Sequence, residues 1–245
     1  MNLTFDRNLF VQIGLDSGSL TMLGTIVHSF SKPGLYRGVV HEGEKVKAAF
    51  AINSDNNSAS AQASIDLASL VSGSETSFGE DCRCYKQLPS TDHIPPTFVV
   101  NPRGYILFHV AQGSGGYYVH VRRADAEKED KGYDTRSLAE GDVFTAIILR
   151  PGAYSIVNTL TKAQAELIVS YPKPAGKRYQ PAPPVRVVCN QKSFEPNQLK
   201  TDPGQGVIFE CRAYSRIQIK LEKPDDGAKA SERVRPTGRI ANRLR

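Results

Sequence analysis

The stretch from Ile148 to Thr159, ILRPGAYSIVNT, decides the fold class of this chain. Apolar residues recur at every second position up to Pro151-Gly152, and a second alternating run leaves the pair through Tyr154 and Ile156. This period of two is typical of a strand that buries one of its faces. Because proline has no N–H to offer a sheet, we expect Pro151 in the connection between two strands. We interpret the stretch as a corner of a β scaffold and not as part of a site.

The same alternation runs through most of the chain. It is clear in KVKAAFAI (45–52), AQASIDL (61–67) and AQAELIVSY (163–171), which polar, Gly-rich or Pro-rich stretches separate. The strand, Pro-Gly turn, strand pattern at Pro151 resembles the last hairpins of immunoglobulin-like, cupredoxin-like and transthyretin-like sandwiches. We therefore predict a mostly β protein of serial antiparallel β-sandwich domains, immunoglobulin- or cupredoxin-like, with a small C-terminal β module and a basic tail.

Breaks in the alternation suggest domain boundaries. One break is polar, and the other contains five prolines and is typical of a stiff linker. The expected parts are an N-terminal β domain (1–71), a connecting loop (72–95), a second β-sandwich (96–171), a Pro-rich linker (172–184), a small β module (185–222) and a basic tail (223–245). A module of about forty residues builds only a thin core, so we expect it to dock on the main body or to lend its strands to a partner.

Composition excludes some classes of protein. The hydrophobic fraction is 40% and the charged fraction 23%, which is an ordinary balance for a globular protein. No apolar run approaches the length needed to cross a bilayer, and the first residues do not resemble a signal peptide. We expect a protein of the cytoplasm, or one incorporated in a particle, with no membrane partner.

Four cysteines are the first candidates for chemistry. Cys189 and Cys211 end the alternating runs VRVVC and VIFEC, and both fall on the apolar face of their strands. Two interpretations stay open: a pair of buried thiols, or a disulfide that stabilises a module too small to be stable alone. Cys82 and Cys84 lie in a polar stretch, where one C-x-C pair is weak evidence for zinc.

Histidines give no complete metal site. His109 and His120 flank the glycine-rich stretch 113–116, so we expect them on adjacent strands of a hairpin, side by side. A metal would need a third ligand, and blue copper would need a nearby cysteine and methionine, which this pattern lacks. The sequence also has no nucleophile elbow, zinc-protease motif or phosphate-binding loop. We predict no metal, no cofactor, no catalytic residue and no enzymatic activity.

Positive charge is concentrated at the C-terminus. The net charge is +6, and residues 231–245 hold five arginines and one glutamate. Arginine binds phosphate and carboxylate groups through several donors at once. We predict that the tail binds phosphate or an acidic partner surface through its five arginines, namely Arg233, Arg235, Arg239, Arg243 and Arg245.

These features favour a structural or interaction protein. We expect a non-enzymatic subunit of a larger assembly, a homo- or hetero-oligomer that contacts protein partners through loops, linker and tail; a component of a virion or other particle fits this profile. One alternative is an accessory protein that binds nucleic acid through the arginine-rich tail. The other is a metal or redox β-sandwich that uses the cysteines and histidines.

Overall fold

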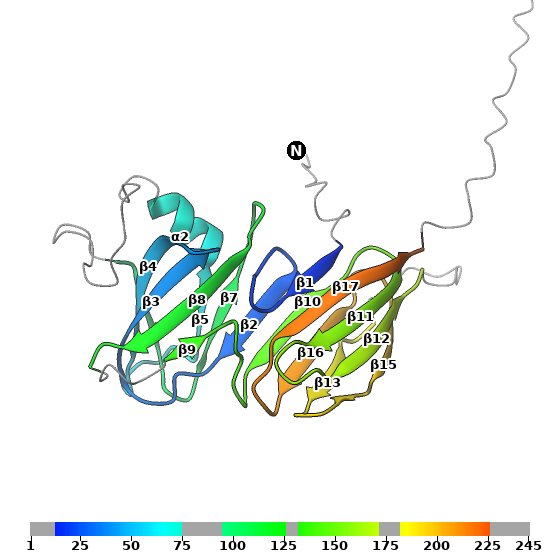
Figure 1. Ribbon diagram of the computed structural model, residues 1–245. Helices are drawn as coiled ribbons and strands as arrows, with labels where there is room; N and C mark the ends of the chain where they lie inside the picture. The colour runs from blue at the N-terminus through cyan, green and yellow to red at the C-terminus, as the bar shows by residue number, and fades with distance from the viewer. Residues whose placement is uncertain (1–12, 75–94, 126–131, 172–181, 226–245) are drawn as a thin grey trace, which may run out of the picture.

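The computed structural model describes residues 13–74, 95–125, 132–171 and 182–225. These residues form two lobes that lie side by side and consist almost entirely of strands (Figure 1). The prediction of a mostly β, sandwich-like protein is therefore confirmed.

Three sheets build the two lobes. The N-lobe sheet contains, in spatial order, β6 (Thr97–Val100), β4 (Lys45–Ser54), β3 (Gly34–Glu42), β8 (Tyr117–Arg123) and β9 (Tyr133–Asp134). The C-lobe sheet contains β1 (Gly14–Asp16), β17 (Ile217–Pro224), β11 (Gly152–Asn158), β12 (Gln164–Val169) and β15 (Gln198–Thr201). The shared sheet contains β14 (Phe194–Glu195), β13 (Val185–Cys189), β16 (Gly206–Cys211), β10 (Val143–Ile147), β2 (Gly24–His28), β7 (Tyr105–His109) and β5 (Gln62–Asp66).

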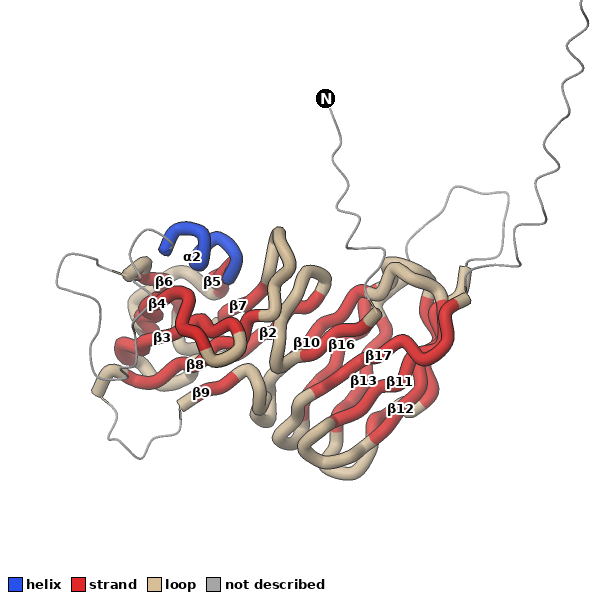
Figure 2. The backbone as a smooth tube through the Cα atoms, turned by 45° about the horizontal axis from the view of Figure 1, so that its top comes forward, coloured by secondary structure: helices blue, strands red, loops and turns tan. Residues whose placement is uncertain are grey.

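The shared sheet runs without a break from one lobe to the other. Its strands β2 and β10 pair across the junction, with Ile26 opposite Phe144. Figure 2 shows β7, β2, β10 and β16 following one another through this region. The helix α2 (Leu67–Ser74) follows β5 and buries Leu67 and Val71. Each lobe is thus a sandwich of one half of the shared sheet and one sheet of its own.

Alternating side chains fill the space between the sheets of each lobe. In β12 every second residue is buried, which matches the period of two in its sequence. The N-terminal lobe buries Phe50, Ile52 and Phe108, and the C-terminal lobe buries Phe144 and Phe209. Burial of these apolar side chains is the main stabilising contribution to both lobes.

The two lobes are copies of one arrangement of strands. Each lobe contains two parallel strand pairs at equivalent places. The pair β4–β6 of the N-terminal lobe corresponds to β12–β15 of the C-terminal lobe, and the pair β5–β7 corresponds to β13–β16. The sequence shows the same repeat at a constant spacing: GLDSGSL (14–20) corresponds to GYDTRSL (132–138), and KPGLY (32–36) to RPGAY (150–154). We therefore treat residues at equivalent positions as matched pairs.

Each copy contributes its first strand to the opposite lobe. The strand β1 pairs with β17 in the C-terminal lobe, while β9 pairs with β8 in the N-terminal lobe. The residue that follows each strand holds the chain in the same way: the Ser17 hydroxyl accepts the Ile217 amide at 3.0 Å, and the Thr135 hydroxyl accepts the Val119 amide at 2.9 Å. This exchange ties the lobes together in addition to the shared sheet.

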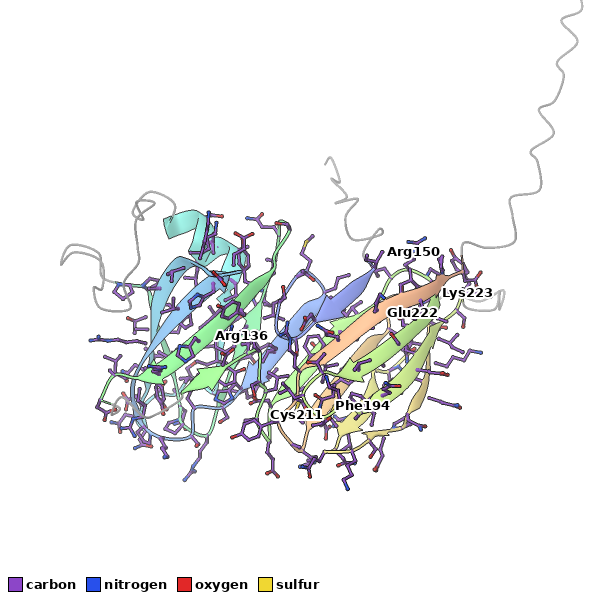
Figure 3. All side chains as sticks on the ribbon, viewed as in Figure 1. Arg136, Arg150, Phe194, Cys211, Glu222 and Lys223 are labelled. Atoms are coloured by element: carbon purple, nitrogen blue, oxygen red, sulfur yellow. The ribbon has the colours of Figure 1, made fainter. Side chains whose placement is uncertain are left out.

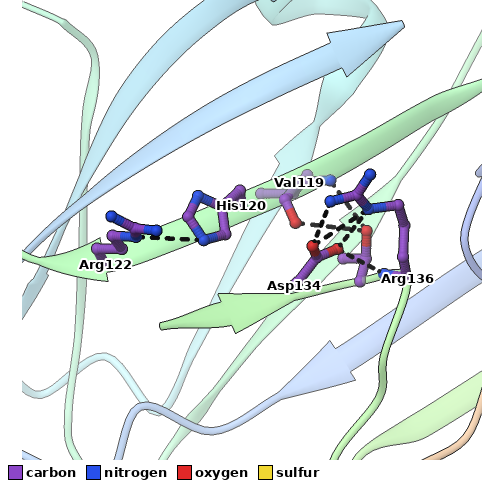
Figure 4. A network of polar contacts seen from close by, with 6 residues as sticks. Val119, His120, Arg122, Asp134 and Arg136 are labelled. Atoms are coloured by element: carbon purple, nitrogen blue, oxygen red, sulfur yellow. Dashed lines mark hydrogen bonds and ion pairs between the residues drawn. The ribbon is translucent and has the colours of Figure 1, made fainter. Parts of the chain in front are cut away.

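Charged side chains secure both exchanged strands. Asp16 accepts hydrogen bonds from Arg216 at 2.8 and 3.1 Å, and Asp134 accepts them from Arg136 at 2.7 and 3.1 Å (Figure 4). The Arg136 guanidinium also lies 4.1 Å from the ring centre of Tyr118. Burial alone would raise the pKa of each carboxyl, but the arginine hydrogen bonds bring both below the usual value.

The strand pairing does not follow the domain boundaries expected from the sequence. Apart from the exchanged strands β1 and β9, strands from 1–71 and from 96–123 build one lobe, whereas residues 132–171 and the module 185–222 build the other. The module is therefore half of a lobe and not an appended unit, and four of the strand pairs are parallel where antiparallel sandwiches were expected. Alternation shows which face of a strand is buried, but it does not identify the neighbouring strand.

The Pro151-Gly152 stretch is a corner between two sheets. It connects β10 in the shared sheet to β11 in the C-lobe sheet, and the two strands do not pair. Gly152 is required here because a Cβ atom would lie 2.6 Å from the carbonyl oxygen of Lys223 on β17. Figure 3 shows Arg150 and Lys223 at the same end of the C-terminal lobe.

Candidate functional site

A pocket of about 320 Å³ opens in the N-terminal lobe next to the junction of the lobes. Its walls come from the end of β2 and the corner after it, from the end of β8, and from the exchanged strand β9 with the turn that follows. Polar, basic and aromatic side chains all line it; those used below are His28, Lys32, Tyr36, Arg123 and Tyr133.

A buried acid fixes the orientation of His28 in this pocket. The Nδ1 atom lies 2.5 Å from Oδ1 of Asp142, whose side chain is only 3% exposed. The second carboxylate oxygen of Asp142 accepts the amide of Ala139 at 2.7 Å. Because an ionised carboxylate only accepts hydrogen bonds, Nδ1 of His28 must carry the proton and donate. Nε2 of His28 has no hydrogen-bond partner among the described residues, so this atom can bond to a ligand or to water.

Aromatic rings form the wall behind His28. The imidazole stacks on Tyr133 with 3.7 Å between ring centres and meets the edge of Phe30 at 4.6 Å. The Tyr133 hydroxyl is buried and makes no hydrogen bond in the described structure. Burial, followed by the charge of Asp142, raises the pKa of Tyr133 well above its usual value, so the hydroxyl stays protonated.

Two cations lie at the mouth of the pocket. Arg123 makes a bidentate ion pair with Asp125 at 2.8 and 2.9 Å, and its guanidinium lies close to Gly34. Lys32 is exposed and forms no ion pair with another described residue. Tyr36 fixes the backbone here, since its hydroxyl donates to the Lys32 carbonyl at 2.7 Å. The lining thus combines Lys32, the Arg123–Asp125 ion pair and aromatic rings with the carboxylate of Asp134, which is paired with Arg136.

The equivalent position in the C-terminal lobe is filled. Only about 10 Å³ remains there, between Leu15, Ile147, Ile148, Leu149 and Tyr154. The repeat equates Leu15 with Tyr133, Ile147 with Ser29, and Leu149 with Ser31. The small cavity of the C-terminal lobe is thus lined by aliphatic residues at positions where the N-terminal lobe has serine and tyrosine.

The structure brings two of the predicted site residues together. Cys189 and Cys211 are buried, stand opposite each other on β13 and β16, and are both free thiols (Figure 3 labels Cys211). Their hydrogen bond, followed by burial, raises the pKa of the Cys189 thiol. Cys82, Cys84 and the five tail arginines lie outside the described residues.

The prediction that His109 and His120 lie side by side on a hairpin is wrong. His109 lies on β7 in the shared sheet and His120 on β8 in the N-lobe sheet, so the glycine-rich stretch 113–116 links two sheets and is not a hairpin turn. The described residues contain no group of three metal-ligating side chains. No helix in the described part of the chain is long and apolar enough to cross a membrane.

Sequence inspection missed the pocket residues because they are far apart along the chain and form no motif. The usable signal was the repeat, in which Ser29 and Ser31 interrupt a corner that is aliphatic in the second copy. No protein-family model, curated protein or solved structure matches the chain.

Proposed function

We propose that this protein is a non-enzymatic binding protein that holds a small organic anion, a carboxylate or phosphate on an aromatic group, in the N-terminal-lobe pocket. Lys32 and Arg123 supply positive charge, His28 and Tyr133 supply ring surface, and Nε2 of His28 supplies a hydrogen-bonding atom. Concave pockets in which a few placed polar groups lie beside aromatic rings are typical of small-molecule sites.

One observation carries this proposal: two copies of the same fold differ at the same position. The pocket is open and polar in the N-terminal lobe and filled with aliphatic residues in the C-terminal lobe. Because filling is compatible with this fold, folding alone does not require the open pocket.

Binding is favoured over catalysis by the contacts of His28. A nucleophile would need to bond to the free ring nitrogen of the Asp142–His28 pair. The Ser29 hydroxyl, next to His28 in the chain, instead donates to the Gly104 carbonyl at 2.8 Å. The arrangement therefore suits a ligand group better than a protein nucleophile at Nε2.

The test is calorimetric titration with benzoate and phenyl phosphate, with benzyl alcohol as the neutral probe. We expect saturable binding of an anion and at least about tenfold weaker binding of the alcohol, as one charge-assisted contact provides. Ser29→Ile with Ser31→Leu, which copies the filled lobe, should abolish binding while leaving the circular dichroism spectrum unchanged.

A second double variant tests the charges without filling the pocket. Lys32→Gln with Arg123→Gln should weaken anion binding at least about tenfold, whereas the exposed control Lys200→Gln with Arg212→Gln should not. Equal binding of the alcohol, or full binding by the filled variant, would contradict the proposal.

A role as a subunit of a larger assembly is a second proposal. It is favoured by the shared sheet, whose outer face carries a row of apolar side chains, Val27, Leu107, Val143 and Ile208 among them. Three further predictions also stay proposals. The arginine tail would bind nucleic acid or an acidic surface, and the cysteines would have a redox role. The sandwiches would be of the immunoglobulin- or cupredoxin-like form. Salt-dependent retention on nucleic acid and metal analysis of the purified protein test the first two alternatives.

A further inference from the structure

We propose that the ligand of the N-terminal-lobe pocket is a hydroxylated aromatic acid, whose hydroxyl group donates a hydrogen bond to Nε2 of His28. This inference rests on the proposed function, because it concerns the same pocket. It adds a second point of recognition, separate from the charges of Lys32 and Arg123. The Asp142–His28 pair, the packing of the imidazole and the place of the pair in the repeat all support it.

Asp142 decides which nitrogen of His28 can accept a hydrogen bond. Its Oδ1 atom lies 2.5 Å from Nδ1, so Nδ1 donates, and in the neutral imidazole the other nitrogen is then an acceptor. The side chain of Asp142 is only 3% exposed, and its Oδ2 atom accepts the Ala139 amide at 2.7 Å. Both oxygens of the acid are thus occupied within the protein, whereas Nε2 of His28 remains for a ligand.

Nε2 of His28 faces open space. The His28 side chain is 17% exposed and lines the pocket. Among the described residues, the buried polar side-chain atoms without a hydrogen-bond partner are Nδ1 of His41 and the hydroxyl of Tyr133. Nε2 of His28 also has no partner but does not belong to this buried group, so it is accessible. A hydroxyl group of a ligand in the pocket can therefore bond to it.

Two aromatic rings hold the His28 imidazole in place. Tyr133 stacks on it with 3.7 Å between ring centres, and the edge of Phe30 meets it at 4.6 Å. Together with the bond to Asp142, these contacts fix the plane and the direction of the ring. An acceptor that is fixed before binding loses little conformational entropy when a ligand arrives, which favours a ligand with a matching donor.

The second copy lacks this pair although its strands pair in the same way. The repeat equates His28 with Ala146 and Asp142 with Gly24, and Ala146 stands opposite Gly24 at the other end of the β2–β10 pair. The fold therefore forms there without an acid or a histidine. A buried charge is costly to a protein even when it is paired. Because the charge of Asp142 lies beside the larger of the two cavities, it points to recognition of a ligand and not to a need of the fold.

These groups define what a ligand must carry. Its anionic group meets Lys32 or Arg123, its ring lies beside Tyr133, and its hydroxyl group meets Nε2 of His28. A site that accepts a hydrogen bond from a ligand hydroxyl discriminates against the analogue without it, because the polar atom of the protein is then left unpaired. The expected ligand class is therefore narrower than aromatic anions in general.

Calorimetric titration at about pH 8, where a free imidazole is mostly neutral, tests the proposal. The probes are meta- and para-hydroxybenzoate, benzoate, the methylbenzoates of similar size, and the methoxybenzoates, whose ether oxygen can only accept. We expect one hydroxybenzoate to bind at least about tenfold more tightly than benzoate and than its methyl and methoxy counterparts. Equal binding of the hydroxy and methoxy compounds would overturn the proposal, since Nε2 would then be a donor.

A double variant that copies the other lobe removes the acceptor and leaves no buried charge behind. His28→Ala with Asp142→Gly should reduce the preference for hydroxybenzoate over methylbenzoate to a ratio of about one. The control His109→Ala changes a histidine of the shared sheet outside the pocket, and it should keep the preference. A preference that persists in the double variant would show that another group binds the hydroxyl.

Proton–nitrogen correlation NMR of the His28 ring gives a readout that needs no ligand. We expect a proton on Nδ1 and none on Nε2 at the same pH, and a proton on Nε2 would overturn the proposal. The titrations separate this inference from the proposed function. Binding of benzoate with no preference for a hydroxyl group removes this inference alone, whereas a pocket that binds no aromatic anion removes both.

Discussion

Tyr36 and Tyr154 make the same hydrogen bond at equivalent corners of the two lobes. Each hydroxyl donates to the carbonyl oxygen four residues earlier, Lys32 at 2.7 Å and Arg150 at 2.6 Å. We expect Tyr36→Phe and Tyr154→Phe each to lower the free energy of unfolding by about 1 kcal/mol, the net value of a hydrogen bond. Urea unfolding of both single variants and of the double variant is the measurement; the two losses should add, since the corners share no partner.

The glycine that follows each corner proline should differ in tolerance. A Cβ atom at Gly152 would meet backbone, the Lys223 carbonyl oxygen at 2.6 Å, whereas at Gly34 the nearest atom is the flexible Arg123 guanidinium at 3.3 Å. Gly152→Ala should therefore destabilise the protein by about 1 kcal/mol or more, and Gly34→Ala by less. Thermal unfolding of the two variants decides this, and an equal loss in both would show that contact with β17 is not the cause.

Asp16 should support the exchanged strand β1 in a pH-dependent way. Its pKa is lower in the folded state, so the stability it contributes is complete above the unfolded value of about 4 and is lost as the pH falls through the folded pKa. Asp16→Asn should cost about 1.5–3 kcal/mol at pH 7, the range for hydrogen bonds to a charged group. The difference between wild type and variant should shrink below pH 4 in urea titrations; a difference that is constant with pH would contradict the ion pair with Arg216.

The thiols of Cys189 and Cys211 should be unreactive in the folded protein. Both are buried, and the hydrogen bond between them and burial keep Cys189 protonated. Iodoacetamide labelling followed by peptide mass spectrometry should modify them only at the rate of unfolding, and added urea should accelerate the reaction. Rapid labelling without urea would show that β13 opens independently of the C-terminal lobe.

The C-terminal tail should be dispensable for folding. The strand β17 ends at Pro224, and residues 228–245 hold five arginines and one lysine against a single glutamate. Truncation after Gly227 should leave the thermal transition nearly unchanged and weaken association with a phosphate-rich or acidic partner, most at low salt. Heparin retention is a direct measurement; a truncated chain that unfolds several degrees lower would place the tail in the core.

Residue patterns along the chain were enough to predict the strands, their inward faces and the corner at Pro151. Alternation in AQAELIVSY predicted the buried residues of β12, and the missing N–H of proline placed Pro151 between strands. These are local properties, since the period of a strand and the chemistry of proline depend only on neighbouring residues. The paired burial of Cys189 and Cys211 follows from the same alternation.

The pairing of the strands and the place of the pocket became known from the three-dimensional arrangement. So did the crossing of the first strand of each copy to the other lobe. His28, Arg123 and Tyr133 are far apart along the chain and meet because β2, β8 and β9 converge at the lobe junction. The pocket is much larger in the lobe that has Ser29 and Ser31 than in the lobe that has Ile147 and Leu149 at the equivalent positions. That comparison requires knowing which residues share a position in space, and alternation along a single strand does not specify it.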